Sequence, residues 1–159
     1  VRAAVPADTD HIKQLARDNH MFEPDEMGDF DEMLAGFLDG SLDDHRWIVA
    51  TDDAGGVVAA AYSAPEPFSD RMWNLYFIAT DPSRHGLGAG TTLIESVEAD
   101  LRGRVEEVAR TLIIDTSSLD GYEQARTFYR ARGFVEEARI RDFYGPGDDK
   151  VNFWKRLVD

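Results

Sequence analysis

The chain has 159 residues, of which 43% are hydrophobic and 30% are charged, and its formal net charge is −14. It holds no cysteine, which excludes disulfides, thiolate zinc sites and a cysteine nucleophile. The negative charge argues against a nucleic-acid partner, and no apolar run is long enough to span a membrane. We therefore expect one domain over residues 1–159, and a cytoplasmic location because residues 1–5 turn polar too early for a signal peptide.

Hydrophobic periodicity and turn residues predict how the chain is divided into helices and strands. In chain order we expect a strand at 2–5, a helix from Asp8 or Thr9, a helix at 27–38, strands at 47–51, 57–63 and 72–79, a helix after Gly90, a strand at 112–115, a helix at 121–132, and strands at 134–144 and 151–157. This order, β-α-α-β-β-β-α-β-α-β-β, indicates a mixed α/β or α+β sheet with helices on both faces.

Cap and turn residues support these boundaries. Asp8 or Thr9 suits the N-cap of the first helix, and Gly40 and Gly133 suit the left-handed residue that follows a helix. Residues 52–56 and 145–148 contain the glycines and aspartates typical of hairpin turns.

Residues 75–93 form the most informative stretch, because a strand leads through the loop His85-Gly86-Leu87-Gly88-Ala89-Gly90 into a helix. Glycines let the backbone approach a ligand closely, and a helix N-terminus offers unpaired N–H groups and the positive end of a dipole. Such a loop suits a phosphate or pyrophosphate. A dinucleotide-binding loop needs Gly at position 91, where this chain has Thr. A P-loop needs Gly-Lys-Ser/Thr, which is absent here. A glycine pair taken alone is also explained by a tight turn.

The surroundings of this loop resemble the acyl-CoA-binding signature of the GNAT N-acetyltransferase superfamily. In that signature a strand, a proline and Gln/Arg-x-x-Gly-x-Gly/Ala precede a helix; here His85 takes the Gln/Arg position, and Gly88 and Gly90 take the glycine positions. A second family pattern, Asn-x-x-Ala-x-x-Phe-Tyr-x-x-x-Gly-Phe, is matched at residues 122–134, with Tyr122 in place of Asn. Two motifs in the right order are more specific than either alone, and the element order also matches.

The resemblance implies a mostly antiparallel central sheet of about seven strands with about four helices. It also implies acetyl-CoA as cosubstrate and no metal. Loop amides would hold the pyrophosphate, and the end of the preceding strand would pair with the pantetheine arm, where an N–H near Ala79 would stabilise the oxyanion. The cofactor-binding residues implied are Ile78, Ala79, Thr80, His85, Gly86, Leu87, Gly88, Ala89, Gly90, Thr91 and Tyr122.

Tyr129 matches the family's usual general acid, which would protonate the departing CoA thiolate. Its helical spacing with Ala125 and Phe128 is also typical of a core residue. Many members of the family place a glutamate general base on the strand before the loop, but the strand at 72–79 has no carboxylate. Asp115, which ends the next strand and could reach the gap, is the candidate general base. Asp115 can equally be a capping residue before Thr116.

The acceptor is expected to be a small-molecule or peptide amine. Nine carboxylates lie between Met21 and Asp44 without a Lys or Arg, and they either attract a cationic amine or form a solvated helix face. They are Glu23, Asp25, Glu26, Asp29, Asp31, Glu32, Asp39, Asp43 and Asp44. Five further residues could line an acceptor pocket or belong to the core: Trp73, Asn74, Tyr76, Phe143 and Tyr144.

The sequence allows three functional hypotheses. The first is an N-acetyltransferase that works by direct attack in a ternary complex, as a monomer or a homodimer. The second is a module of the same fold that binds acyl-CoA as a sensor or structural ligand without transfer. The third is a domain for a different phosphate ligand.

Overall fold

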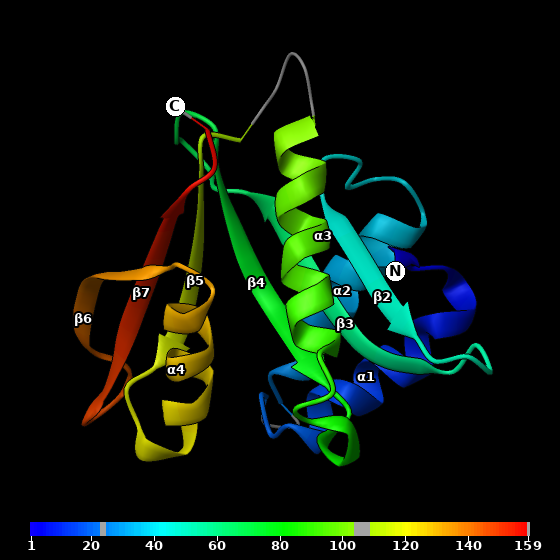
Figure 1. Ribbon diagram of the computed structural model, residues 1–159, viewed down its shortest axis with the longest axis horizontal. Helices are drawn as coiled ribbons and strands as arrows, with labels where there is room; N and C mark the ends of the chain where they lie inside the picture. Colours follow the sequence, from blue (N-terminus) through cyan, green and yellow to red (C-terminus); the bar gives the residue numbers. More distant parts are fainter. Residues whose placement is uncertain (23–24, 104–108, 159) are drawn as a thin grey trace. The chain divides into compact units, whose positions relative to one another are not determined.

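The computed structural model describes residues 1–22, 25–103 and 109–158, and its element order is the predicted one (Figure 1). The strands are β1 (Arg2–Ala3), β2 (Arg46–Thr51), β3 (Val57–Pro65), β4 (Met72–Thr80), β5 (Thr111–Ser117), β6 (Val135–Gly145) and β7 (Asp148–Arg156). The α-helices are α1 (Thr9–Asp18), α2 (Met27–Leu38), α3 (Ala89–Gly103) and α4 (Glu123–Ala131). Three short 3-10 turns, η1 (Pro6–Asp8), η2 (Pro82–Arg84) and η3 (Asp120–Tyr122), precede helices or the glycine loop.

The strands follow the order β1-β2-β3-β4-β5-β7-β6 in a seven-stranded sheet. Four neighbouring pairs, β1–β2, β2–β3, β5–β7 and β7–β6, are antiparallel. Strand β4 pairs with β5 in parallel, with Met72, Trp73 and Asn74 opposite Thr111, Leu112 and Ile113. The predicted mixed, mostly antiparallel sheet is thereby confirmed.

The chain divides into two compact units, and β4 contributes to both. Unit 1 comprises Val1–Ala64 and Phe77–Ala99, and unit 2 comprises Pro65–Tyr76 and Asp100–Asp159. The glycine loop therefore belongs to unit 1, whereas Asp115, Tyr122 and Tyr129 belong to unit 2.

The core of unit 1 forms where α1 and α2 cover one face of its strands. Because side chains alternate along a strand, Trp47 and Val49 point to the same face, and the Trp47 ring stacks on Tyr62 at 4.5 Å. Phe30 of α2 meets Trp47 edge-on at 5.2 Å. Within this unit, α1 and α2 lie behind the strands and α3 lies in front of them (Figure 1), as the predicted two-sided arrangement requires. Helical spacing predicts an apolar stripe on α3, and its residues are buried: Leu93, Ile94, Val97 and Leu101.

Unit 2 packs α4 against the sheet formed by β5, β7 and β6. Phe153 of β7 lies opposite Ile114 of β5 and is fully buried. The ring of Tyr129, on α4, lies 5.6 Å from the ring of Phe153. Gly133 ends this helix with a φ of +84°, as its position in the sequence predicts.

Several predicted boundaries differ from the structure for local reasons. Asp8 precedes α1 but makes no side-chain cap, because its carboxylate binds the Arg2 guanidinium and the Val5 N–H. Helix α4 starts at Glu123, since Tyr122 N–H bonds Leu119 O in the tighter η3 turn. Strand β7 begins at Asp148, opposite Gly145, so the hairpin turn is shorter than expected. The first residues of this strand are polar, and a hydrophobicity pattern therefore does not indicate a strand there.

Among the described residues, no helix is long and apolar enough to cross a membrane.

Helix α2 has the predicted bounds, and Gly40 follows it with a φ of +82°. Of the nine acidic residues of this region, Glu23 lies outside the described residues, and Asp31 pairs with Lys13 of α1 at 3.0 Å.

Candidate active site

The glycine loop of unit 1 starts from a well-anchored turn at the end of β4. Asp81 N–H donates to Val58 O at 2.9 Å, and its carboxylate accepts hydrogen bonds from the Ser83 N–H and hydroxyl. The Arg84 guanidinium then binds Asp52 in the β2–β3 hairpin turn at 3.0 Å. The Ser83 contacts hold the turn itself, and the Val58 and Asp52 contacts join it to a neighbouring strand and hairpin, so together they fix where the loop begins.

The loop itself presents backbone rather than side chains. Gly86 and Gly88 have φ values of +79° and +91°, in the left-handed region that favours glycine, and residues 85–88 are all exposed. A Cβ added at either glycine would meet nothing within 4 Å. The space beside the backbone is therefore open to a ligand.

Helix α3 begins at Ala89, so the motif runs into its first turn. Thr92 N–H closes the first helical bond, to Gly88 O at 3.0 Å. The N–H groups of Ala89, Gly90 and Thr91 precede that bond and have no acceptor within their own helix. Three donors in a row at the positive end of a helix dipole fit a pyrophosphate.

The end of β4 in unit 1 has its two faces in different surroundings. Ala79 points into the core beside α1 and α2, whereas Ile78 and Thr80 are half-buried on the other face. The carbonyl of Thr80 already accepts a hydrogen bond from the Asn19 side chain at 3.0 Å. Asn19, at the end of α1, gave no signal in the sequence because the contact spans distant parts of the chain.

In unit 2, Tyr129 is buried between aromatic rings, at 7% exposure. Its ring meets Phe134 at 6.3 Å and Phe153 at 5.6 Å. Burial, and secondarily Tyr144, raises the pKa of its hydroxyl, so Tyr129 is the neutral phenol at neutral pH. Among the described residues no hydrogen-bond partner of this hydroxyl is found, although a buried tyrosine hydroxyl usually has one.

Asp115 of β5 lies at the centre of a polar group that we call the carboxylate cluster: Glu66, Asn74, Tyr76, Asp115, Lys150 and Asn152. Asp115 Oδ1 accepts from Asn152 Nδ2 at 2.7 Å, and Oδ2 accepts from Asn74 Nδ2 at 3.3 Å, with Lys150 Nζ at 3.6 Å. The capping role that the sequence allowed for Asp115 is wrong. That role belongs to Ser117, whose hydroxyl accepts a hydrogen bond from Leu119 N–H.

Asn74 extends the cluster to Glu66, on the segment that leads into β4. Its Nδ2 also donates to Glu66 Oε2 at 3.2 Å, and Tyr76 Oη donates to the same oxygen at 2.8 Å. Sequence reasoning considered Asn74 and Tyr76 only as pocket or core residues, and missed Glu66, Lys150 and Asn152. Their residue types carry no motif. Strand pairing brings Lys150 and Asn152 to Asp115, and the side chain of Asn74 links Glu66 to it.

Of the five residues that could line an acceptor pocket, Trp73 lies apart from Asn74 and Tyr76 in unit 2. Trp73 points to the opposite face of β4 from Asn74 and Tyr76, because side chains alternate along a strand. Phe143 already has a cation over its ring, Lys150 Nζ at 4.3 Å. Burial, Asp115, Asp148 and Tyr122 together raise the pKa of Tyr144 to about 12.

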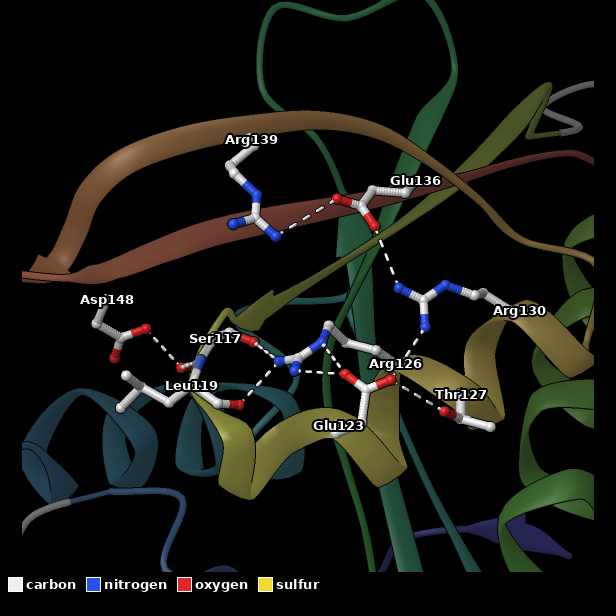
Figure 2. A network of polar contacts seen from close by, with 9 residues as sticks. All are labelled: Ser117, Leu119, Glu123, Arg126, Thr127, Arg130, Glu136, Arg139 and Asp148. Carbon is white, nitrogen blue, oxygen red and sulfur yellow. Dashed lines mark hydrogen bonds and ion pairs between the residues drawn. The ribbon is translucent and has the colours of Figure 1, made fainter.

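A second polar network joins β5, the strand of Asp115, to α4, the helix of Tyr129 (Figure 2). Arg126 is 5% exposed, and its Nη1 donates to the carbonyls of Ser117 at 2.6 Å and Leu119 at 2.9 Å. Its other nitrogens bind the Glu123 carboxylate, and the Ser117 hydroxyl bonds Asp148 of β7. One arginine thus ties α4 to the end of β5, and the sequence showed it only as an unassigned motif position.

No group of three His, Cys, Asp or Glu side chains suited to a metal ion is found in the described part of the chain. The sites that it does contain are therefore an exposed glycine loop, a buried tyrosine and the carboxylate cluster.

Known proteins match this chain in sequence and in fold. The family model described as the Acetyltransferase (GNAT) domain matches residues 43–136, whereas no curated protein matches significantly. A solved structure of a candidate GNAT-family acetyltransferase from Desulfovibrio desulfuricans superposes with a TM-score of 0.86 at 28% identity, covering 99% of this chain and 98% of that one.

Two more distant structures share the fold. One is an aminoglycoside 6'-N-acetyltransferase in complex with coenzyme A, with 16% identity, a TM-score of 0.74, and coverage of 97% of this chain and 93% of that one. The other is the ribosomal-protein-S18-alanine N-acetyltransferase from Escherichia coli, with 18% identity, a TM-score of 0.75, and coverage of 99% and 93%. Since the family model spans more than half of the chain, this protein belongs to the GNAT acetyltransferase family.

Proposed function

We propose that this protein transfers an acetyl group from acetyl-CoA to a primary amine by direct attack in a ternary complex. The observation that carries the proposal is Tyr129, a buried, neutral tyrosine at the motif position of the general acid, with no protein partner for its hydroxyl among the described residues. The open glycine loop, with three helix donors behind it, supports acetyl-CoA as the acyl donor.

In the proposed reaction, the amine nitrogen attacks the thioester carbonyl carbon and the carbon–sulfur bond breaks. The Tyr129 hydroxyl gives its proton to the departing sulfur, and the proton lost by the amine passes to Asp115. Asp115 has a well-defined orientation for this role, since Asn74 and Asn152 hold its two oxygens. The N–H groups of Gly86 to Thr91, with Ile78, Ala79, Thr80, His85 and Tyr122, are the proposed cofactor contacts.

The test is a screen for CoA release with a panel of primary amines: n-butylamine, 1,4-diaminobutane, amino-acid amides and an alanyl peptide. Because the chain has no cysteine, a colorimetric thiol reagent detects only the CoA thiol. We expect release above the amine-free rate with at least one acceptor. Acetyl-CoA binding without release across the whole panel would contradict transfer and favour the non-catalytic module, and failure to bind any CoA would contradict both.

A further inference from the structure

The carboxylate cluster contains a buried amide whose orientation is set by its neighbours. Asn74 is 2% exposed, and its Nδ2 faces Glu66 Oε2 and Asp115 Oδ2. Carboxylates accept hydrogen bonds and amide nitrogens donate them, so the amide cannot be turned around. Its Oδ1 is left buried without a hydrogen-bond partner, which destabilises the fold. The fold accepts this cost in order to hold two carboxylates beside each other.

These two carboxylates are not balanced by positive charge. Lys150 lies 3.6 Å from Asp115, but in the described residues neither Lys nor Arg pairs with Glu66, whose partners are the neutral side chains of Asn74 and Tyr76. No donor in that part of the structure reaches Glu66 Oε1. The cluster therefore has a net negative charge and one unused acceptor atom, which favours a cationic ligand.

The spacing of the carboxylates suits an ammonium group. Glu66 Oε2 and Asp115 Oδ2 contact the same nitrogen at 3.2 and 3.3 Å, so they lie within about 6.5 Å of each other. The two carboxylates thus already share one N–H donor group, and an ammonium carries three donors with which it can bind one oxygen of each. A Mg²⁺ or Ca²⁺ ion needs six or more oxygen ligands, more than this pair offers.

The segment that carries Glu66 is held in place on both sides. Glu66 N–H donates to Met72 O at 2.8 Å, and Asp70 binds Arg110 at 2.6 Å. Phe68 and Arg71 have φ values of +63° and +58°, a backbone conformation that costs energy for side chains of this size. These contacts hold the backbone of the segment, and Asn74 and Tyr76 hold the Glu66 carboxylate.

We propose that Glu66 and Asp115 together bind the ammonium group of the acceptor amine, and that Glu66 selects a cationic alkylamine as substrate. This inference rests on the proposed acetyl transfer. The ammonium N–H groups donate to one oxygen of each carboxylate. One proton passes to Asp115, which releases it to water and leaves the nitrogen lone pair free to attack. The second proton, lost by the nitrogen after the attack, passes to Asp115 in turn and replaces the proton that Tyr129 gives to the sulfur. Glu66 keeps its charge throughout and acts by binding.

The test uses the full chain with acetyl-CoA and n-butylamine, or the best amine of the screen. We expect Glu66→Gln to raise the amine KM about 10- to 100-fold, the range for loss of a charge-assisted hydrogen bond, with acetyl-CoA KM and the unfolding temperature unchanged. The charge-preserving Glu66→Asp should recover part of the effect, and Tyr76→Phe should raise the amine KM about two- to fivefold. Glu137→Gln, the same change at an exposed position of β6, is the control and should alter neither KM.

An unchanged amine KM in Glu66→Gln would overturn the inference and leave acetyl transfer standing. If the wild-type protein releases no CoA with any amine, binding decides the matter instead, by saturation-transfer NMR with n-butylamine and its neutral match 1-butanol. Binding of n-butylamine alone, lost in Glu66→Gln, would uphold the ammonium site while the proposed reaction fails. Equal binding of both probes, or of neither, would overturn the site.

Discussion

The glycine loop of unit 1 and the carboxylate cluster of unit 2 are built from different kinds of chemical group. The loop offers backbone N–H groups on an exposed turn, where two residues have left-handed backbone angles and no side chain is needed. The cluster offers side-chain oxygens whose positions depend on strands β4, β5 and β7. Almost any residue that keeps the backbone conformation preserves the loop, whereas one changed side chain disturbs the cluster.

This difference explains why the two sites were unequally visible in the sequence. Backbone donors require glycines at fixed spacing, and such spacing is a motif that can be read directly. Side-chain clusters assemble from residues that strand pairing brings together, and Asn74, Asp115 and Asn152 are separated by tens of positions. If the loop backbone binds the cofactor and the cluster side chains bind the amine, substitutions in the two sites should have separate effects. The largest expected effect comes first.

Removing the Tyr129 hydroxyl should have the largest effect. We expect Tyr129→Phe to lower kcat about 100- to 10,000-fold, because general acid catalysis contributes that range, while acetyl-CoA affinity stays the same. Steady-state kinetics and a direct CoA binding measurement check this. Tyr62→Phe deletes the same atom from a buried ring of unit 1 and should change kcat less than about twofold; equal rates for Tyr129→Phe and wild type would end the proposed acid role.

Removing the Arg126 guanidinium should reduce stability and turnover together. Arg126→Met leaves the carbonyls of Ser117 and Leu119 without their donor, and unpaired groups of this kind cost about 1–3 kcal/mol each. We expect urea unfolding to give a loss of about 2–4 kcal/mol. Arg130→Met, at a half-exposed position with contacts of 3.2 and 3.4 Å, should cost less than about 1 kcal/mol. Equal losses in the two variants would refute a special role for Arg126.

A methyl group at Gly88 should weaken acetyl-CoA binding. Its φ of +91° costs a residue with a Cβ about 1–2 kcal/mol, although nothing lies within 4 Å of that Cβ. We expect Gly88→Ala to raise the acetyl-CoA KM about tenfold and to leave the amine KM unchanged. Gly28→Ala, where the space is also open but φ is not positive, is the matched control. A raised amine KM in Gly88→Ala would mean that loop and cluster do not act separately.

The smallest effect concerns the dependence of stability on pH. Burial raises the pKa of Tyr62 from 10.0 to about 12, so the unfolded chain loses this proton at lower pH than the folded chain. The stability from Tyr62 is fully present below pH 10 and is lost as the pH rises toward 12. Between pH 9 and pH 11 the free energy of unfolding, measured with urea, should fall by about 1 kcal/mol less in Tyr62→Phe than in the wild type. The pKa of Tyr129 is raised as well, so part of the fall should persist in the variant. Identical falls in the two proteins would contradict the Tyr62 assignment.

The sequence by itself determined the order of the elements, the bounds of α2, the buried stripe of α3 and the glycine loop. These features depend on residues close together in the chain, so periodicity, caps and glycine spacing report them directly. The motif at residues 122–134 also predicts Tyr129 as the candidate general acid, because helical spacing and motif positions are local.

Only the tertiary structure decided the surroundings of Asp115 and the role of Arg126. The partners of Asp115 come from β4 and β7, and no local pattern says which strands will be neighbours. The unpaired Asn74 Oδ1 likewise exists only once two carboxylates are brought to the same amide. A hydrogen bond between distant residues depends on how the sheet is assembled, and that is why the tertiary structure was needed to find Glu66.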